Sequence, residues 1–449
     1  MMRFYISLLM IFLLSINARA QKSLSLNDAI KIALQKNTTL AKNVANLSAT
    51  QSNLKAAYGQ LLPSLGAEGN WRWDRSEGPS GTFVQGGTLL FRSGNQESRT
   101  YQAGASTQWT LFNGLANFAA ISRGKNDLES ARLALERVKQ DIVFNTISYY
   151  YQVLNAKQVL KVREDDLAYN RKNLEIITER NKLGAVTLAD VYAQQVNVGN
   201  SELALIQAKN DADTYQSQLI TYLGLDVMSE MNISDPIETD TTKVFEGEQF
   251  LKQFDNLRAA VDEALNNRLD YKSAQYRLES AYNGITVAKG GYYPVLTNSN
   301  SFGSTAGSIS ELFNSKGYSV GLSLNIPIFS GWSTENNVEY SVVTAKTREI
   351  ELTELERQIK IDLKKTYLDF QAAQKRLDVS AKNVLSALQN REIEQEKYNI
   401  GSGTFVNLLL ASSNYTLALQ TNINNRFDFY RLKSQLEYYL GIIDFTKFE

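Results

Sequence analysis

Apolar residues recur every seven positions over two long stretches of the chain. The first stretch contains two successive seams, Ile121, Leu128, Leu135, Ile142 and Tyr149, followed by Val153, Leu160, Leu167 and Leu174. The second stretch repeats the spacing with Leu363, Phe370, Leu377 and Val384. A seven-residue apolar repeat is typical of helices that pack as left-handed coiled coils. We therefore expect two long helices, over about 115–182 and 332–399.

Each long helix is followed by a glycine and then by a shorter helical stretch. Gly184 and Gly401 stand at these reversals, so we predict two helical hairpins, over residues 115–223 and 332–440. Each long helix would measure on the order of 100 Å, which exceeds the usual length of helices in globular proteins. Shorter leading helices are expected over about 26–58 and 257–288. The heptad pattern is equally typical of a soluble rod or filament.

Four segments between the helices are predicted to be β-strands, at about 65–75, 100–111, 295–304 and 317–328. Three of them alternate apolar with polar residues, whereas the segment 295–304 is polar and alternates weakly. A period of two with one apolar face is typical of transmembrane barrel strands, and about ten residues suffice for a tilted crossing. Aromatic residues near the strand ends fit an interfacial belt: Trp71, Trp73, Tyr101, Trp109, Tyr318 and Trp332. A half-buried soluble sheet has the same alternation.

Four strands are too few to close a transmembrane barrel, because known barrels begin at about eight strands. An open edge in lipid leaves backbone groups unpaired, at several kcal/mol for each group. Several copies of the chain must therefore pool their strands. Two copies would provide eight strands and three would provide twelve, and the pattern itself does not choose between them.

The helices and strands fall into two copies of one pattern. Leu26-Asn27-Asp28-Ala29 recurs 231 residues later as Leu257-Arg258-Ala259-Ala260, and Leu111-Phe112-Asn113-Gly114 recurs 217 residues later as Ile328-Phe329-Ser330-Gly331. The first copy is thus 14 residues longer, in a segment between Pro63 and Gly104 that is rich in turn formers and reads as a surface loop. We divide the chain into a first repeat, 21–226, a connector, 227–256, and a second repeat, 257–449.

The N-terminus has the pattern of a secretory signal peptide over residues 1–20. Arg3 precedes an apolar run over 4–16, and Ala18-Arg19-Ala20 fits a cleavage site. The run is too short to span a bilayer as a helix. The protein is therefore expected to be exported.

Composition narrows the possible chemistry. The chain has 47 basic and 47 acidic residues, no cysteine and no histidine. Disulfides, thiolate nucleophiles and Cys/His zinc sites are excluded, and the commonest general base is absent. The zero net charge provides no electrostatic footprint for nucleic acid. We predict a protein without enzymatic activity, metal or cofactor.

The order and spacing of these motifs resemble the TolC-type outer-membrane efflux family over essentially the whole mature chain. The resemblance rests on the two-copy layout, on the helix-to-strand junctions Pro63 and Pro294, on the two strand-to-helix junctions, and on the hairpin tips. It implies a mixed, mostly α fold: a homotrimer with a twelve-stranded β-barrel continuous with a periplasmic helical tunnel. It also implies a passive conduit for efflux or type I secretion, located in the outer membrane of a Gram-negative bacterium. The implied partners are outer-membrane lipid, a periplasmic adaptor (membrane fusion) protein and an inner-membrane pump of the RND, ABC or a similar type.

The same resemblance places the functional residues at the hairpin tips. Adaptor docking is expected there, at Gly184, Ala185, Thr187, Gly401, Ser402, Gly403 and Thr404. Gate-like positions are occupied by Arg180, Asp190, Tyr398 and Asn407. The second tip departs from the family pattern, because Gly403 stands where the best-known member has an arginine, and Asn407 and Leu410 stand where carboxylates form an acidic ring. Two simpler interpretations stay open: the glycines serve a sharp helix reversal with Thr187 and Thr404 as helix caps, and Asp190 is a solvated carboxylate at a helix start.

A second function class fits the coiled-coil pattern. A secreted structural protein or adhesin would have long helices but no transport activity, and it would stay soluble without detergent. The exported cargo cannot be identified from the sequence.

Overall fold

The computed structural model describes residues 23–78, 80–92, 94–228, 231–234 and 257–448. The predicted signal peptide, 1–20, and most of the predicted connector, 227–256, lie outside these ranges. The chain divides into two compact units. Residues up to 45, 133–272 and 354 onward form one of them, called the helical unit below, and residues 46–132 and 273–353 form the other, called the strand unit.

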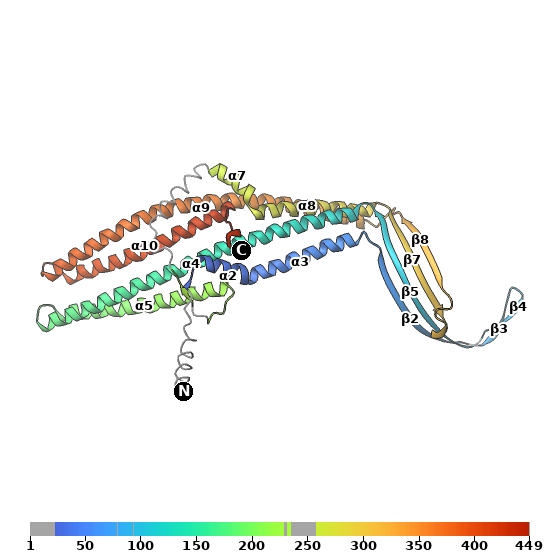
Figure 1. Cartoon of the computed structure of the whole chain (residues 1–449), viewed down its shortest axis with the longest axis horizontal. Helices are drawn as coiled ribbons and strands as arrows, with labels where there is room; N and C mark the ends of the chain where they lie inside the picture. Colours follow the sequence, from blue (N-terminus) through green and yellow to red (C-terminus); the bar gives the residue numbers. More distant parts are fainter. Residues whose placement is uncertain (1–22, 79, 93, 229–230, 235–256, 449) are drawn as a thin grey trace, which may run out of the picture. The chain divides into compact units, whose positions relative to one another are not determined.

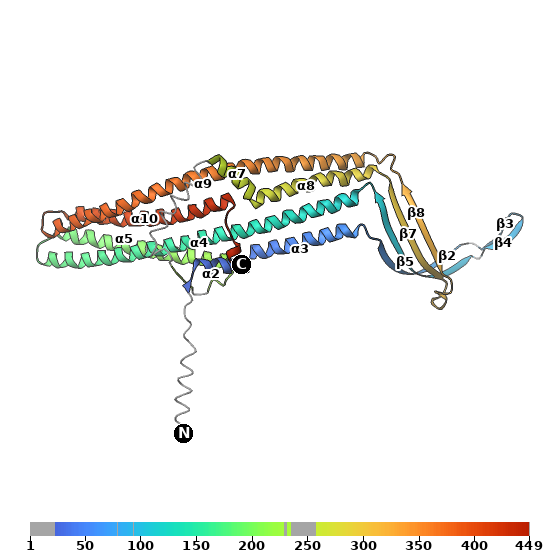
Figure 2. The same cartoon turned by 45° about the horizontal axis from the view of Figure 1, so that its top comes forward.

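Four long helices form the two predicted hairpins. Helix α4 (Ala116–Lys182) and α9 (Ser333–Asn399) each contain 67 residues, and they are followed by α5 (Leu188–Tyr222) and α10 (Phe405–Leu440). Figures 1 and 2 show α4 beside α5 and α9 beside α10. Within the described ranges, no helix is both long enough and apolar enough to cross a membrane.

The two leading helices are each broken, so the prediction of single helices there was wrong. The first copy has α2 (Leu26–Lys36) and α3 (Thr38–Gly59), and the second has α7 (Leu257–Asn267) and α8 (Leu269–Lys289). At the first break, the Asn37 side-chain oxygen accepts from the Thr39 backbone N–H (2.8 Å), which caps α3. Its amide nitrogen donates to the Tyr222 carbonyl at the end of α5 (2.9 Å). The second break falls at the equivalent residue, Arg268, whose buried guanidinium binds Asp270.

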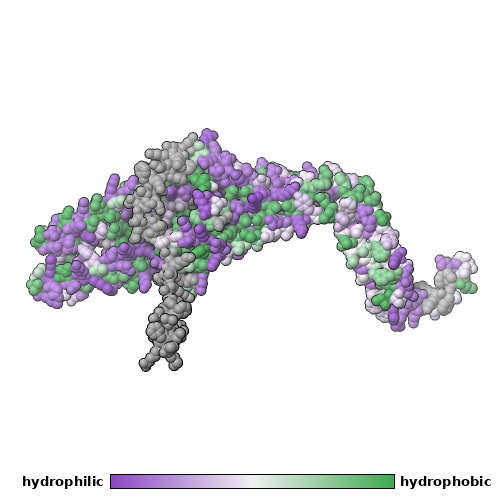
Figure 3. Space-filling model, viewed as in Figure 1, coloured by the Kyte–Doolittle hydropathy of each residue, from purple (hydrophilic) through white to green (hydrophobic). Residues whose placement is uncertain are grey.

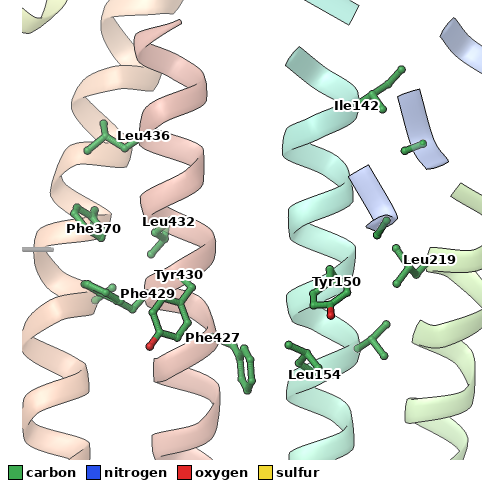
Figure 4. Packing of buried hydrophobic residues seen from close by; sticks show 14 of the residues in the cluster. Ile142, Tyr150, Leu154, Leu219, Phe370, Phe427, Phe429, Tyr430, Leu432 and Leu436 are labelled. Atoms are coloured by element: carbon green, nitrogen blue, oxygen red, sulfur yellow. The ribbon is translucent and has the colours of Figure 1, made fainter. Parts of the chain in front are cut away.

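The core of the helical unit lies near the two helix breaks, where the long helices pass α2 and α7. Tyr150, Phe370 and Phe429 are fully buried, and the rings of Phe370 and Phe429 stack with centroids 5.1 Å apart. Figure 4 shows the cluster, with Ile142, Tyr150 and Leu154 on α4 and Phe427, Leu432 and Leu436 on α10. Two short strands, β1 (Ser23–Leu24) and β6 (Asn232–Ile233), pair in parallel beside it. The Tyr150 hydroxyl donates to the Leu24 carbonyl (3.0 Å), which ties this small sheet to α4.

The main sheet of the strand unit is antiparallel and four-stranded, in the order β2-β5-β7-β8. Its strands are β2 (Ser64–Glu77), β5 (Asn95–Asn113), β7 (Val295–Ala306) and β8 (Gly317–Asn325). The first two are longer than predicted, because their ladder continues past the predicted ends. The last one stops at Asn325 instead of 328, where Pro327 has no N–H to donate to a ladder. Short 3₁₀ turns lie at Gly290–Tyr292, Ile309–Glu311 and Thr446–Phe448.

One face of this sheet is largely apolar, and the described residues leave much of it uncovered. The register places Leu65, Thr107, Asn300 and Val320 in one row across the four strands. Along the same face, Tyr318, Val320 and Leu322 are 81%, 79% and 70% exposed. Hydrophobic side chains on the sheet are therefore presented outward instead of being packed into a core.

Two asparagines interrupt that apolar face on β7 and explain the weak alternation of this strand. Asn298 and Asn300 lie in register with Leu322 and Val320. Asn300 donates to the Asn298 side chain (2.7 Å) and to the Thr107 hydroxyl (3.0 Å), and Asn298 donates to the Gly321 carbonyl (3.3 Å). Their amide groups are thus hydrogen-bonded within the sheet, which lowers the cost of placing them on an apolar surface.

The strand-to-helix junctions repeat the same backbone conformation in both copies. Leu115 and Trp332 both have φ of 66°, an uncommon value for residues other than glycine. They occupy equivalent positions, directly after Gly114 and Gly331. Figure 3 shows apolar residues gathered where the strands meet the helices, and Ile328, Phe329 and Trp332 are all largely exposed there.

The predicted surface loop of the first copy contains a β-hairpin. Strands β3 (Gly81–Gln85) and β4 (Thr88–Arg92) pair antiparallel. Gly86 and Gly87 form the turn with φ of 63° and 82°, as a two-residue type I′ turn requires.

Candidate functional site: the hairpin tips

The tip loops, residues 183–187 and 400–404, reverse the chain in the same way. Gly184 and Gly401 have φ of 71° and 75°, in the left-handed region that glycine adopts without strain. At the first tip the Ala185 N–H donates to the Arg180 carbonyl (2.9 Å), and at the second the Ser402 N–H donates to the Lys397 carbonyl (2.9 Å). These bonds satisfy carbonyls at the ends of α4 and α9.

The two predicted helix caps are confirmed. The hydroxyl oxygens of Thr187 and Thr404 accept from the backbone N–H groups of Asp190 and Asn407, each at 3.2 Å. The Asp190 carboxylate in turn accepts from the Thr187 N–H (3.1 Å) and hydroxyl (2.8 Å), which completes a capping box. This geometry fits the simpler interpretation of Asp190, a carboxylate at a helix start, and its role in a gate stays a prediction.

An apolar cluster joins the two hairpins just behind their tips. Ile177 of α4, Val191 of α5 and Phe405 of α10 are buried together. Partly buried residues from both hairpins surround them: Leu174, Val186, Tyr398 and Leu409. The two tips therefore pack as one structure within the helical unit.

Two of the predicted gate residues meet across the hairpins. The Arg180 guanidinium of α4 lies 5.2 Å from the centre of the Tyr398 ring of α9, and that ring lies 5.6 Å from the Phe405 ring. Such a cation–π contact contributes about 0.5–1 kcal/mol at an exposed site. Burial raises the pKa of the Tyr398 hydroxyl above its ordinary value, with Arg180 opposing this shift and the Asp190 charge adding to it. The fourth predicted gate residue, Asn407, donates its backbone N–H to the Thr404 hydroxyl in the cap of α10.

Apolar side chains remain uncovered at the outermost positions of both tips. Leu183 and Ile400, which are equivalent in the two copies, are 84% and 70% exposed. Leu188, Val406 and Leu410 are exposed beside them. Exposed apolar residues that gather in one place are typical of a surface that binds a partner.

A polar ladder between α4 and α10 was missed by the sequence analysis. Asp166 accepts hydrogen bonds from Ser201 of α5 (2.8 Å) and from Thr416 of α10 (2.9 Å), so it links both hairpins. Further rungs between α4 and α10 include Asn155 to Asn424 (3.0 Å), Arg163 to Gln420 (2.7 Å) and Gln158 to Arg426. A cavity of about 410 Å³, lined in part by Arg163, Asp166 and Ser201, opens beside this ladder.

A signal for this ladder does exist in the sequence. The ladder residues of α4 share a face and stand next to the apolar seam that contains Leu160 and Leu167. Polar residues beside a heptad seam indicate a helix interface that is partly hydrophilic. Their partners on α10, however, lie 250 or more residues away in the sequence and could not be named from it.

The predicted interfacial aromatics lie toward the two ends of the sheet. Trp71 pairs with Tyr101, and Trp71, Trp73 and Tyr318 are exposed near the end of the sheet away from the helices. At the helical end, Trp109 donates from its indole N–H to the Leu61 carbonyl (2.8 Å), and Trp332 packs edge-on against Phe329. Their role as a membrane belt remains a prediction.

The chain matches a known family over most of its length. A profile of the outer membrane efflux protein family matches residues 29–225 and 260–441, one segment for each repeat. The chain belongs to this family. The predicted TolC-type resemblance is thereby confirmed, as is the predicted mostly helical two-copy fold.

Individual relatives are distant in sequence but span nearly the whole chain. Protein CyaE of Bordetella pertussis is 23% identical over 404 residues, covering 89% of this chain and 80% of the relative. Outer membrane protein TolC of Escherichia coli is 21% identical over 423 residues, covering 91% and 80%. The crystal structure of the outer membrane protein VceC of Vibrio cholerae superposes with a TM-score of 0.76 at 19% identity, covering 93% of this chain and 96% of VceC.

Membership of this family fixes the location and the broad role. The protein lies in the outer membrane, with its helical portion in the periplasm, and it is a channel subunit of an efflux or secretion system. Its relatives are channel proteins instead of enzymes. Within the described residues, no group of three or more acidic side chains is arranged to hold a metal ion.

Proposed function

We propose that three copies of this chain close into one passive conduit without enzymatic activity. Each copy would contribute its four strands to a twelve-stranded barrel and its two hairpins to a periplasmic tunnel. Cargo would pass from an inner-membrane pump, of the RND, ABC or a similar type, to the cell exterior. The pump would provide the energy, because the chain has neither histidine nor cysteine and no predicted catalytic constellation.

The observation that carries this proposal is the state of the four-stranded sheet. Its edge strands, β2 and β8, pair on one side only within the described residues. On its apolar face, Leu65 of β2 and Val320 of β8 are each 79% exposed. In lipid the exposed face is favourable, but unpaired edges are not, since each unsatisfied backbone group costs several kcal/mol. Pairing β8 of one copy with β2 of the next would satisfy both requirements.

The number of copies and the assembly can be tested on the purified protein. The mass of the detergent-solubilised protein, corrected for detergent, should equal three chains, and the protein should form pores in planar bilayers. A water-soluble monomer that forms no pores would instead support the alternative of a secreted coiled-coil scaffold or adhesin.

We further propose that a periplasmic adaptor docks on the two tips. The exposed Leu183 and Ile400 support this, because they lie on the tip loops beside the predicted docking residues. Replacing both with glutamate should abolish export and adaptor co-purification while the trimer and its membrane insertion persist. The matched control is Ile361→Glu, at a similarly exposed apolar position on α9 away from the tip. Equal export by the tip variant and the control would contradict adaptor docking at the tips.

The contact between Arg180 and Tyr398 is the proposed latch of the closed end. It joins α4 to α9 behind the tips, and Asp190 adds a negative charge nearby. The variants Arg180→Ala and Tyr398→Ala should each raise single-channel conductance, and the double variant should add little, since both remove the same contact. Unchanged conductance in both single variants would assign these residues to tip packing alone.

A further inference from the structure

The β3–β4 hairpin is joined to the sheet as an extension of its first two strands. The last pair of the β2–β5 ladder is Glu77 with Asn95, and the Gly78 N–H then donates to the Gly94 carbonyl (2.6 Å). The hairpin follows directly as a separate two-stranded sheet. Figure 1 shows β3 and β4 as a pair at the far end of β2 and β5. The hairpin therefore lies at the end of β2 and β5 that is farther from the strand-to-helix junctions.

The composition of β2 and β5 places this hairpin outside the hydrocarbon layer. About ten residues complete a tilted crossing, and the tenth residue of β2 is Trp73. Charged residues follow at once: Arg75 forms ion pairs with Glu77 (2.6 Å) and Glu97 (3.7 Å). Charges of this kind are costly within the apolar band of a barrel. Strands β3 and β4 lie beyond them, on the outer side.

The hairpin nevertheless exposes apolar side chains. Val84 and Leu89 are directly paired across the two strands, and they are 66% and 72% exposed. Within the described residues, no third strand pairs with β3 or β4. A two-stranded hairpin alone is at best marginally stable in water, and uncovered strand edges invite pairing. The Val84–Leu89 face therefore needs a cover that lies outside the lipid.

A second copy of the same hairpin is the cover that the structure favours. Among the described strands, β2 is an open edge of the sheet, so the next copy in a closed assembly would lie along the strand that carries the hairpin. Copies tethered in this way meet at an effective concentration in the millimolar range, far above that of a diffusing partner. Each copy also brings the same apolar face, so identical residues of all copies can meet around the common axis of a closed ring.

We propose that the β3–β4 hairpins of neighbouring copies pack together through Val84 and Leu89 and form an apolar cluster over the outer mouth of the channel. This inference rests on the proposed closed assembly. It assigns the insertion, which the second repeat lacks, to contact between copies on the external side.

The absence of native cysteine allows a direct test. Leu89→Cys, oxidised in intact outer membranes, should give covalently linked chains on non-reducing gels. The matched control is Thr88→Cys, the adjacent residue of β4, which lies on the other face of the hairpin and pairs with Gln85. The control should link several-fold less. Absence of linked chains for Leu89→Cys, or equal linking at both positions, would overturn the proposal.

A second measurement tests whether the hairpin is instead surrounded by water or by lipid. A fluorescent label on Leu89→Cys should be shielded from both iodide in water and brominated lipid. Strong quenching by iodide would mean a free hairpin, and strong quenching by brominated lipid would mean a hairpin in the bilayer, and either result overturns the proposal. If Leu89→Cys fails to assemble, its register partner Val84→Cys takes its place in both assays.

The size of the assembly is measured on the same samples. Should none of the variants, nor the unmodified protein, run as a multiple of the chain, the proposed channel assembly itself fails. Should all of them assemble while linking at Leu89 and Val84 is absent, only the hairpin contact fails.

Discussion

Large apolar side chains are buried in the helical unit but exposed on the four-stranded sheet. In the helical unit, Phe370 and Phe429 are completely buried, whereas on the sheet Tyr318 and Leu322 are 81% and 70% exposed. Exposing a large apolar side chain to water costs about 1.5–3 kcal/mol. Lipid tails are as apolar as leucine, so the same exposure in a bilayer costs little. The two regions are therefore built for two different solvents.

The largest expected effect comes from deleting a core aromatic. Phe370→Ala should lower the free energy of unfolding by about 3–5 kcal/mol, because it leaves a cavity among tightly packed helices. Leu322→Ala on the sheet should change it by less than about 1 kcal/mol, since that side chain is exposed and would face lipid in the proposed barrel. Thermal unfolding in detergent, followed by circular dichroism, measures both. Similar losses in the two variants would remove the distinction between the regions.

A charge placed on the apolar face tests whether that face enters the bilayer. Leu322→Lys places a charge on the apolar face and should cost about 2–4 kcal/mol of insertion free energy near the middle of the bilayer. Ser323→Lys, its neighbour on the opposite face, should insert normally. The folded fraction in outer membranes, read from heat-modifiable mobility on gels, reports the difference. Equal insertion of the two lysine variants would place both faces of the sheet in water.

A smaller effect is expected at the reversal of the first hairpin. Gly184→Val forces a β-branched residue to φ of 71°, at a cost of about 1–2 kcal/mol. Gly199→Ala, in the middle of α5 where an added methyl group meets no atom within 4 Å, should instead stabilise by about 1 kcal/mol. Chemical unfolding of the two variants shows whether each substitution lowers or raises the free energy of unfolding. A neutral result for Gly184→Val would show that the tip loop adapts freely.

The smallest effects are expected from two carboxyl groups of the helical unit, which should respond to pH in opposite directions. Burial alone would raise the pKa of Asp270, but the hydrogen bond from Arg268 and the charge of Arg137 lower it below its ordinary value. Stability from Asp270 is therefore present above its ordinary pKa and is lost as the pH falls through the lowered one. Burial raises the pKa of Glu437, so stability falls as the pH rises from the ordinary value through the raised one.

The neutral variants isolate these two contributions. Asp270→Asn should flatten the acid side of the curve of unfolding midpoint against pH. Glu437→Gln should remove the decline at higher pH. Curves parallel to that of the unmodified protein in both variants would show that neither carboxyl group controls the pH response.

Local patterns predicted the long elements well, and long-range contacts account for what they missed. The heptads around Leu135 and Leu377 placed both hairpins, because coiled-coil packing leaves a period in the sequence. The breaks at Asn37 and Arg268 were missed, since they depend on contacts with the ends of α5 and α10, such as the bond from Asn37 to Tyr222.

The same distinction between local patterns and long-range contacts applies to the candidate site. Thr187 and Thr404 could be assigned as caps, because a cap acts within three residues of itself. The meeting of Arg180 with Tyr398, and of Asp166 with Thr416, joins residues of different hairpins and required the structure. The strand β7 was predicted, but its face could not be assigned, because Asn298 and Asn300 stand at the apolar positions and their hydrogen bonds to Thr107 and Gly321 lie on neighbouring strands.

Depth-resolved labelling of β8 tests the central claim most directly. The cysteine-free chain accepts a single fluorescent label at Leu322→Cys or at Ser323→Cys, two adjacent residues on opposite faces of the sheet. In reconstituted vesicles, brominated lipid should quench the label at 322 strongly and the label at 323 weakly, because only the first face meets the bilayer. Equal quenching at the two positions, or none at 322, would contradict a sheet that forms the wall of an outer-membrane channel.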